Sequence, residues 1–280
     1  MSVPPPLTDR PALALHRARA RLEDARFLHD EALDQVQERL EEVNRAFTAP
    51  AIVTAHPELW AGAVPGALLV EPDETLRLAP GQHDLVIHAM ALQWADDPVG
   101  QLVQARRALR PDGLFLAVFP GGQTLSELRA ALAEAETALR GGLSPRVAPM
   151  GELRDLGGLL QRSGFALPVA DTAPLTVTYR SALHLMRDLR AMGETNALAA
   201  RDRRFAPRAL FARAAEIYHA HFAADADRVR ATFELVFLTG WAPDESQQKP
   251  MRPGSAKARL ADALGVPERP VPDPATPGRD

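Results

Sequence analysis

The chain has 280 residues, of which 46% are apolar and 24% are charged, and its formal net charge at pH 7 is −4. This composition is typical of a globular protein with one large domain or two small ones. The net charge argues against a generally basic nucleic-acid binder, so no nucleic-acid partner is expected. The absence of cysteine excludes a disulfide framework, a thiolate zinc site, an iron–sulfur cluster and a cysteine nucleophile.

The sequence carries no obvious targeting segment. Residues 1–10 contain three prolines and no apolar core, so they do not match a secretory signal. The arginines between residues 10 and 26 are interleaved with acidic residues, which is atypical of a mitochondrial presequence. No stretch approaches the ~20 consecutive apolar residues that a membrane span needs. We therefore expect a cytoplasmic protein without a membrane span.

The first part of the chain, residues 1–47, is predicted to be a helical segment. Between residues 11 and 47, apolar residues recur at intervals of three and four, with charged residues between them. The amount of charge favours an outer layer or lid over a buried helix.

A different period begins after residue 47. Short apolar runs at 51–54, 67–70 and 84–89 are typical of buried parallel strands that are covered on both faces. Asp97 and Pro98 are suited to begin a helix, and Pro-Asp-Gly at 111–113 is suited to end it in a turn before an apolar strand at 114–119. Strand, helix and strand in this order predict a crossover unit of a doubly wound α/β sheet.

The rest of the chain adds further elements to this core. Helices are predicted at 124–139 and 151–163, and a closing pair of strands at 165–169 and 175–179. We therefore place an α/β core at 48–180, followed by a mainly helical addition at 181–260 that completes the domain. That addition has helical periodicity at 182–192 and 207–223 and an apolar, β-favouring run at 232–241. Residues 261–280 are rich in proline and poor in apolar groups, which predicts a disordered tail.

Residues 83–119 carry a resemblance to a known superfamily. The strand His-Asp-Leu-Val-Ile-His-Ala, a helix, Leu-Arg-Pro-Asp-Gly and the strand Leu-Phe-Leu-Ala-Val-Phe resemble the fourth and fifth strands of class I S-adenosylmethionine-dependent methyltransferases. The resemblance implies an α/β fold with a doubly wound, Rossmann-like methyltransferase sheet and S-adenosylmethionine as cofactor.

A narrower resemblance covers roughly residues 13–256. Gly-Gly-Gln-Thr-Leu-Ser-Glu-Leu-Arg, Met-Gly-Glu-Thr-Asn, and Gly-Trp followed by Glu-Ser-Gln are similar to motifs of the methyltransferase-like assembly factors of respiratory complex I. The mitochondrial member of that family is understood as an arginine hydroxylase that acts on a complex I subunit. This resemblance implies a protein substrate or partner, such as a complex I subunit. The stretches that carry it are 121–129, 142–149, 155–160, 188–196, 240–241, 245–247 and 254–256.

The cofactor edge departs from the pattern of the superfamily. A methyltransferase of this class has a glycine-rich turn after its first strand, but residues 51–60 contain no glycine, and Pro57 removes a backbone donor. Only about 29 residues separate Val53 from Gln82, which is too few for two further strands and two helices. Pro72 stands where an adenine-contacting aspartate is usual, with Asp73 beside it. These departures predict a sheet truncated in its first half and weakened or lost cofactor binding.

Four residues are candidates for cofactor binding on this basis: Asp73, His88, Met90 and Trp94. His88 falls near the carboxyl edge of its strand, where ligands of α/β sheets bind, although ordinary packing is the alternative. The same alternative applies to Trp94 and to Trp241. No metal site is predicted, and the catalytic residues stay unassigned.

Asp188, Glu194 and Asn196 are candidates for the family's special chemistry, with helix capping as the alternative. Three functions remain open. The first is a complex I assembly factor with weakened cofactor binding, and the second is an active methyltransferase or protein arginine hydroxylase. The third is a carboxyl methyltransferase of malonyl-acyl-carrier protein, which the Met-Gly-Glu-Thr-Asn stretch disfavours.

Overall fold

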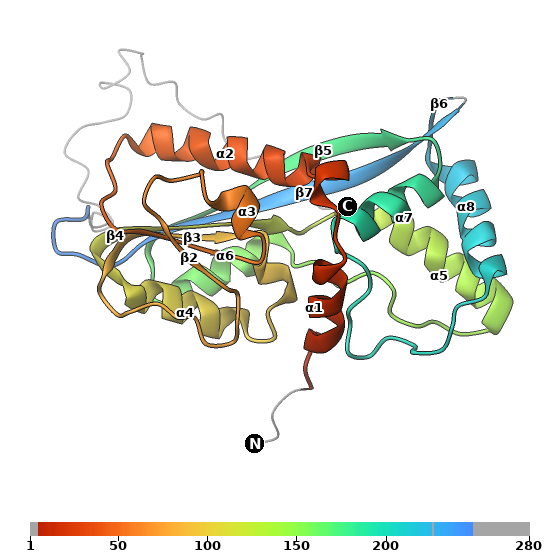
Figure 1. Ribbon diagram of the computed structural model, residues 1–280, viewed down its shortest axis with the longest axis horizontal. Coiled ribbons are helices and arrows are strands. Elements are labelled where there is room, and N and C mark those ends of the chain that lie inside the picture. The colour runs from red at the N-terminus through yellow and green to blue at the C-terminus, as the bar shows by residue number, and fades with distance from the viewer. Residues whose placement is uncertain (1–4, 226, 249–280) are drawn as a thin grey trace, which may run out of the picture. The chain divides into compact units, whose positions relative to one another are not determined.

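The computed structural model describes residues 5–225 and 227–248 (Figure 1). In this part of the chain, seven strands form one sheet in the order β2-β1-β3-β4-β7-β5, and the short β6 pairs with β7. Strands β2, β1, β3 and β4 are parallel, whereas β7 is antiparallel to β4, β5 and β6. The strands are β1 (Pro50–Thr54), β2 (Leu68–Val70), β3 (His83–Ala89), β4 (Leu109–Pro120), β5 (Ala166–Tyr179), β6 (Ala223–Asp225) and β7 (Arg228–Trp241).

Helices cover both faces of the sheet, as a doubly wound fold requires. One face packs against α2, α5, α7 and α8, and the other packs against α4 and α6. Short 3₁₀ turns, η1 and η2, lie at Leu22–Asp24 and Leu92–Trp94. The helices are α1 (Arg10–Ala18), α2 (Phe27–Val43), α3 (Pro57–Trp60), α4 (Pro98–Ala108), α5 (Ser126–Arg140), α6 (Leu153–Arg162), α7 (Ala182–Ala191) and α8 (Arg208–Phe222).

The parallel strands are apolar because each is buried on both sides. Every residue of β3 is buried, with Leu85 and Ile87 facing α2 and Val86 facing α4. Helix α4 begins where the sequence predicts, because Asp97 Oδ1 accepts a hydrogen bond of 2.8 Å from the Gly100 N–H. These elements confirm the doubly wound α/β class.

The first half of the sheet is short. Between β1 and β3 the structure has a single three-residue strand, β2, which pairs directly with β1. The helix that follows β1, α3, has only four residues. The truncation expected from the spacing of Val53 and Gln82 is therefore present, and it leaves the carboxyl end of β1 next to the loop that follows β2.

The strands expected at 165–169 and 175–179 are one continuous strand, so the prediction of a closing pair was wrong. Asp-Thr-Ala-Pro at 171–174 has the composition of a turn, but these residues pair with β7. Strand β5 lies at the edge of the sheet, where proline is tolerated because its missing N–H faces away from the neighbouring strand. Pro174 accordingly lies opposite Glu234 without breaking the strand.

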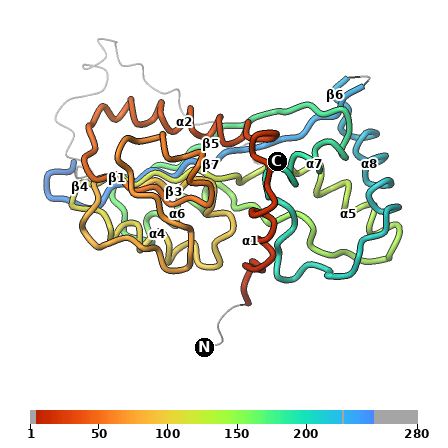
Figure 2. Tube along the Cα trace, in the orientation of Figure 1, coloured from red at the N-terminus to blue at the C-terminus, as the bar shows by residue number. Residues whose placement is uncertain are grey.

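Strand β7 joins the two ends of the fold. Residues 235–241 pair with β4, and the strand runs on as a two-stranded ribbon with β5 (Figure 2). Helices α5, α7 and α8 pack against this ribbon. The described part of segment 181–260 thus contributes two strands, β6 and β7, to the sheet as well as helices α7 and α8.

The domain boundaries given above stay predictions. The tail at 261–280 and the motif at 254–256 lie outside the described residues. No helix of the described part is long and apolar enough to cross a membrane.

Candidate ligand site at the carboxyl edge of the sheet

The parallel strands end at one edge of the sheet, and the N-terminal segment packs over it. The Thr8 hydroxyl donates to the Trp94 carbonyl at 2.9 Å, and the Thr8 N–H donates to Asp96 Oδ1 at 2.9 Å. Arg10 Nη1 donates to the carbonyl of Pro72, just after β2, at 3.4 Å. Helix α1 therefore lies across the loops that follow β2 and β3, at the edge where α/β sheets bind ligands.

A junction around Gly193 and Glu194 fixes this helix. Gly193 has φ +78°, and a Cβ atom there would lie 3.1 Å from Arg17 Cα, so glycine permits both the conformation and the close approach of α1. Trp94 Nε1 donates to Glu194 Oε2 at 2.5 Å, and Arg17 Nη2 lies 3.7 Å from Glu194 Oε1. Glu194 thereby connects α1, the turn η2 and the loop after α7.

A buried polar cluster lies beside this junction. His56 follows β1, where the superfamily has its glycine turn, and its ring stacks edge-on against His29 of α2 with centroids 5.0 Å apart. Trp60 Nε1 donates to His29 Nδ1 at 3.3 Å. Burial, and next the neighbouring His56 and Arg17, lower the pKa of His29 to about 3. Burial also lowers the pKa of His56, with Arg17 as the second cause. Both rings are neutral at pH 7.

Several buried polar atoms at this edge have no hydrogen-bond partner in the described part of the chain. They are Nε and Nη2 of Arg17, Nε2 of His56 and Oε1 of Gln93. An unsatisfied buried polar atom costs about 1–3 kcal/mol, so folded proteins satisfy nearly all of them with protein groups, water or ligands. The edge therefore offers both donors and acceptors to a polar ligand, and this set fits the amino-acid end of S-adenosylmethionine.

A cavity of about 280 Å³ lies next to the same edge. Its wall is mainly apolar, with Trp94, Phe211 and Phe233 as aromatic members and Met150, Met186 and Met192 as flexible ones. Polar groups are contributed by Gln93, Thr124, Arg146, Arg190, Glu194 and Asn196. A largely apolar wall with a few convergent polar groups is typical of a small-ligand or side-chain pocket.

The glycine-rich motif at 121–129 forms one rim of this cavity. A Cβ at Gly122 would lie 2.5 Å from the Glu234 carboxylate, and φ there is +50°. The Gln123 N–H donates to Glu234 Oε2 at 2.9 Å, and the Thr124 hydroxyl donates to the Glu234 carbonyl at 3.1 Å. The motif thus anchors the end of β4 to β7 and positions Thr124 and Leu125 in the cavity wall.

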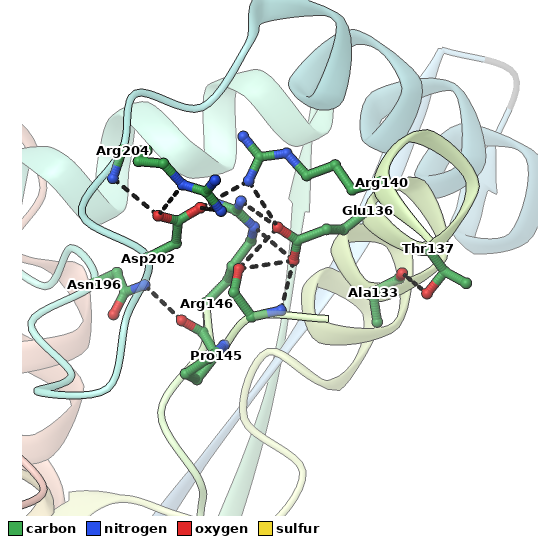
Figure 3. Close-up of polar contacts among 10 residues, drawn as sticks. Ala133, Glu136, Thr137, Arg140, Pro145, Arg146, Asn196, Asp202 and Arg204 are labelled. Carbon is green, nitrogen blue, oxygen red and sulfur yellow. Dashed lines mark hydrogen bonds and ion pairs between the residues drawn. The ribbon is translucent and has the colours of Figure 1, made fainter. Parts of the chain in front are cut away.

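An ion-pair network holds the opposite rim (Figure 3). Arg146 Nη2 donates to Glu136 Oε1 at 2.6 Å, and the Ser144 N–H donates to Glu136 Oε2 at 3.0 Å. Arg140 Nη1 bridges from Glu136 to Asp202, at 3.6 Å and 2.8 Å. Asn196 Nδ2 donates to the Pro145 carbonyl at 2.9 Å. These contacts join α5 to the loops at 142–146 and 196–204.

Of the four predicted cofactor residues, Trp94 lines the cavity. His88 lies on the face covered by α4, where its Nε2 is 2.6 Å from Gln101 Oε1, and Gln101 Nε2 donates to the Asp73 carbonyl at 3.2 Å. Burial lowers the pKa of His88 to about 4. Met90 is buried with φ +52°. The structure thus connects His88 to Asp73 through Gln101, and cofactor binding by all four residues stays a prediction.

Of the other residues that the sequence singled out, some line the cavity and some lie elsewhere in the fold. Glu194 and Asn196 line the cavity, whereas Asp188 lies within α7 and is not among the lining residues. Trp241 pairs with Leu114 at the other end of β4 from Pro120, far from the cavity edge. A Cβ at Gly240 would lie 2.9 Å from Phe165 Cβ, so this glycine serves packing.

Sequence reasoning missed Arg17, His56 and the Glu136–Arg146 pair. One signal was available for Arg17, because it lies seven residues after Arg10 and hence on the same face of α1. His56 lies in the glycine-free turn, but no local pattern indicates that α2 brings His29 against it. Glu136 resembles any exposed helix carboxylate until the loop at 142–146 folds back over it.

Comparisons with known proteins identify a methyltransferase domain and two kinds of relative. Residues 14–117 match the family model described as "Methyltransferase domain". The chain is 40% identical over 184 residues to "Arginine-hydroxylase NDUFAF5, mitochondrial" of Dictyostelium discoideum, covering 65% of this chain and 42% of that protein. It is 34% identical over 222 residues to the human protein of the same name, covering 77% of this chain and 62% of that protein.

Another relative is named for a different activity. The chain is 36% identical over 183 residues to the malonyl-[acyl-carrier protein] O-methyltransferase of Laribacter hongkongensis, covering 63% of this chain and 57% of that protein. Among solved structures, the YcgJ protein of Bacillus subtilis superposes with a TM-score of 0.51 at 11% identity, covering 77% of this chain and 100% of that one. That likeness supports the fold alone.

Residues 14–117 thus match a methyltransferase domain, and the sheet has the doubly wound fold of that class. Over a longer stretch, the chain is similar to the arginine-hydroxylase relatives named above. The chain spans between 42% and 62% of the length of those curated relatives.

The Glu136 network predicts an acid-dependent loss of stability. Hydrogen bonds from Arg146 and Ser144 hold the pKa of this buried carboxyl at about 2, against an ordinary value of 4.5. Because the folded-state pKa is depressed, its stabilisation is complete above pH about 4.5 and is lost as the pH falls toward about 2. Glu136→Gln should therefore lower the free energy of unfolding at pH 7 by an amount on the order of 3 kcal/mol.

Urea unfolding of both proteins across this pH range measures the effect. The difference between them should shrink as the pH falls below about 4.5. Glu134→Gln, at an exposed position of the same helix, is the matched control and should change stability little. A difference between Glu136→Gln and the unchanged protein that stays constant down to the acid limit would contradict the assignment.

Proposed function

We propose that this methyltransferase-like chain is an assembly factor of respiratory complex I that acts on a protein partner, such as a complex I subunit. The observation that carries the proposal is the junction at Glu194. This residue belongs to the family-specific Met-Gly-Glu-Thr-Asn stretch, lines the cavity and binds Trp94 at the carboxyl edge of the sheet. The stretch that sets this family apart thus contributes to the candidate site itself.

The chemistry of the cavity is compatible with a protein side chain. Three aromatic rings and three methionines provide apolar contact, and Glu194 and Asn196 provide polar contacts. The printed name of the relatives, arginine-hydroxylase, supports a protein substrate that presents an arginine. Aromatic faces and a carboxylate are the groups that a guanidinium prefers.

S-adenosylmethionine is the proposed cofactor, with an affinity weaker than that of a site with a glycine turn. The His56 N–H, which follows β1, donates to the Thr54 hydroxyl at 3.2 Å, and Pro57 has no N–H. Backbone donors that bind the cofactor's carboxylate in a glycine turn are thus used or missing here. The proposed location, the cytoplasm, and the absence of a nucleic-acid partner rest on the sequence alone.

A second candidate function is an active S-adenosylmethionine-dependent methyltransferase or protein arginine hydroxylase. The unpartnered polar atoms of Arg17 and His56 favour it, because they offer a ligand new contacts in place of the glycine turn. A malonyl-acyl-carrier-protein methyltransferase is the third alternative, supported by the relative from Laribacter hongkongensis.

The first prediction from this proposal concerns cofactor affinity. Three altered contacts, each of about 1.5–3 kcal/mol, should weaken S-adenosylmethionine binding by about 10³-fold or more relative to an intact site. Isothermal titration calorimetry of the purified protein measures the affinity and the stoichiometry. Micromolar binding with one-to-one stoichiometry would refute the weakened-cofactor proposal.

The second prediction concerns complex I. In a host deleted for the gene, complementation with Glu194→Ala should restore much less assembled complex I than the unchanged gene, because Trp94 loses its hydrogen-bond acceptor and Arg17 loses its ion-pair partner. Glu194→Gln keeps an acceptor for Trp94 and should restore more. Asp73→Ala, an exposed side chain outside the cavity wall, should have a weak effect.

Trp241→Ala provides a second comparison, since this ring lies at the far end of the sheet from the cavity. Assembled complex I and membrane NADH:quinone activity are the measurements, with each variant checked for folding. If the deletion strain retains normal complex I, the assembly proposal is wrong. If Asp73→Ala is the most damaging variant, the active-enzyme candidate takes its place.

A further inference from the structure

The loop between α7 and α8 presents a basic surface. The side chains of Arg203 and Arg204 are 71% and 84% exposed, and the next residue, Phe205, is fully exposed. Arg208, the first residue of α8, is exposed as well. Residues 201–208 contain four arginines and one aspartate, whereas the whole chain has a net charge of −4. The loop therefore differs in charge from the protein as a whole.

Asp202 connects this loop to the rim of the cavity (Figure 3). Its carboxylate lies 2.8 Å from Arg140 Nη1 and 3.1 Å from Arg204 Nε. Arg140 Nη1 also lies 3.6 Å from Glu136 Oε1, which accepts a hydrogen bond from Arg146, and Arg146 lines the cavity. A chain that crosses the rim to reach the cavity therefore meets the basic loop.

A second carboxylate, that of Asp9, holds the loop to the N-terminal end of α1. Its Oδ2 lies 2.8 Å from Arg201 Nη1 and 3.0 Å from Arg203 Nη2. The side chains of Asp9 and Asp202 are only 12% and 14% exposed, so the arginines form the outer surface. Each carboxylate is shared by two arginines, which leaves an excess of positive charge. A guanidinium also has more N–H donors than these pairs use, so donors remain for a further carboxylate.

Phe205 adds an apolar group to this basic surface. Because its ring is fully exposed, it contributes little to the stability of the free protein. A second large apolar side chain, Leu143, is 69% exposed on the neighbouring loop at 142–146. Aromatic residues and arginine are enriched in protein interfaces, and arginine is frequent among the residues that contribute most to binding. The composition of the loop is therefore typical of a docking surface for a polypeptide.

We infer that the basic surface formed by Arg203, Arg204, Phe205 and Arg208 docks an acidic segment of the protein partner. Carboxylates of that segment pair with the arginines, and an apolar side chain of the segment packs on the Phe205 ring. The inference rests on the proposed function, because a partner whose side chain enters the cavity brings its neighbouring residues over this rim. This position beside the cavity favours a polypeptide over an anionic lipid surface as the source of the negative charge.

The experiment measures the binding of two peptides to the full chain by fluorescence anisotropy. The acidic probe is a fluorescein-labelled peptide of glutamate and leucine residues around a central arginine, and its counterpart has glutamine in place of every glutamate. The protein should bind the acidic peptide about 10-fold or more tightly than its counterpart at low ionic strength. This preference should shrink as salt is added, because salt screens exposed charges.

Two variants and one control locate the binding surface. Phe205→Ala should weaken binding of the acidic peptide by about 5- to 10-fold, since an interface anchor is lost, and should leave the thermal midpoint unchanged. Arg208→Glu should weaken it by about 10-fold, because repulsion replaces attraction. Arg154→Glu is the matched control, since Arg154 is exposed on α6 and α6 covers the opposite face of the sheet from α8. It makes the same change in net charge and should bind as the unchanged protein does.

Three outcomes would overturn the inference. The first is equal affinity for the two peptides, or no binding of the acidic peptide at millimolar concentration. The second is a preference for the acidic peptide that Phe205→Ala and Arg208→Glu leave intact. The third is binding of phosphatidylglycerol vesicles that depends on these residues, without a preference for the acidic peptide, which would assign the surface to a membrane. None of these results depends on complex I, whose assembly in the deletion strain tests the proposed function separately.

Discussion

The site depends on the close approach between helix α1 and Gly193. The backbone of α1 comes so close that a Cβ at Gly193 would lie 3.1 Å from Arg17 Cα, and φ at Gly193 lies in the left-handed region that glycine tolerates best. This approach places Glu194 within reach of both Trp94 and Arg17. The helix, the loop after β3 and the loop after α7 are then held by one carboxylate, and α1 closes the carboxyl edge of the sheet.

The family motifs have two kinds of role in this arrangement. The glycines at 121 and 122 and the glycine at 240 permit close packing of the β4–β7–β5 region, where a Cβ would collide with Val236, Glu234 or Phe165. Met-Gly-Glu-Thr-Asn, by contrast, contributes cavity wall and the junction with α1. Similarity to the arginine-hydroxylase relatives at these glycines therefore indicates a shared fold. Similarity at Met-Gly-Glu-Thr-Asn indicates a shared site.

Much of the fold was predictable because its signals are local. Buried parallel strands are continuous apolar runs, and Asp97 with Pro98 marks the start of α4, so the crossover unit follows from the sequence. That β5 is one continuous strand could not be predicted from the sequence, because Pro174 indicates a turn unless it is known to lie on an edge strand. In the site, Trp94 and Glu194 were both candidates, but their hydrogen bond joins residues 100 positions apart. The contacts of Arg17 with Glu194 and of His56 with His29 form only when α1 and α2 pack in the folded chain. No local sequence pattern predicts that packing.

A crystal structure of the protein tests the central claim most directly. The account predicts that α1 is packed on Gly193, with Glu194 accepting a hydrogen bond from Trp94 Nε1 and lying beside the Arg17 guanidinium. A structure in which α1 lies away from Gly193, with Glu194 contacting neither Trp94 nor Arg17, would contradict it.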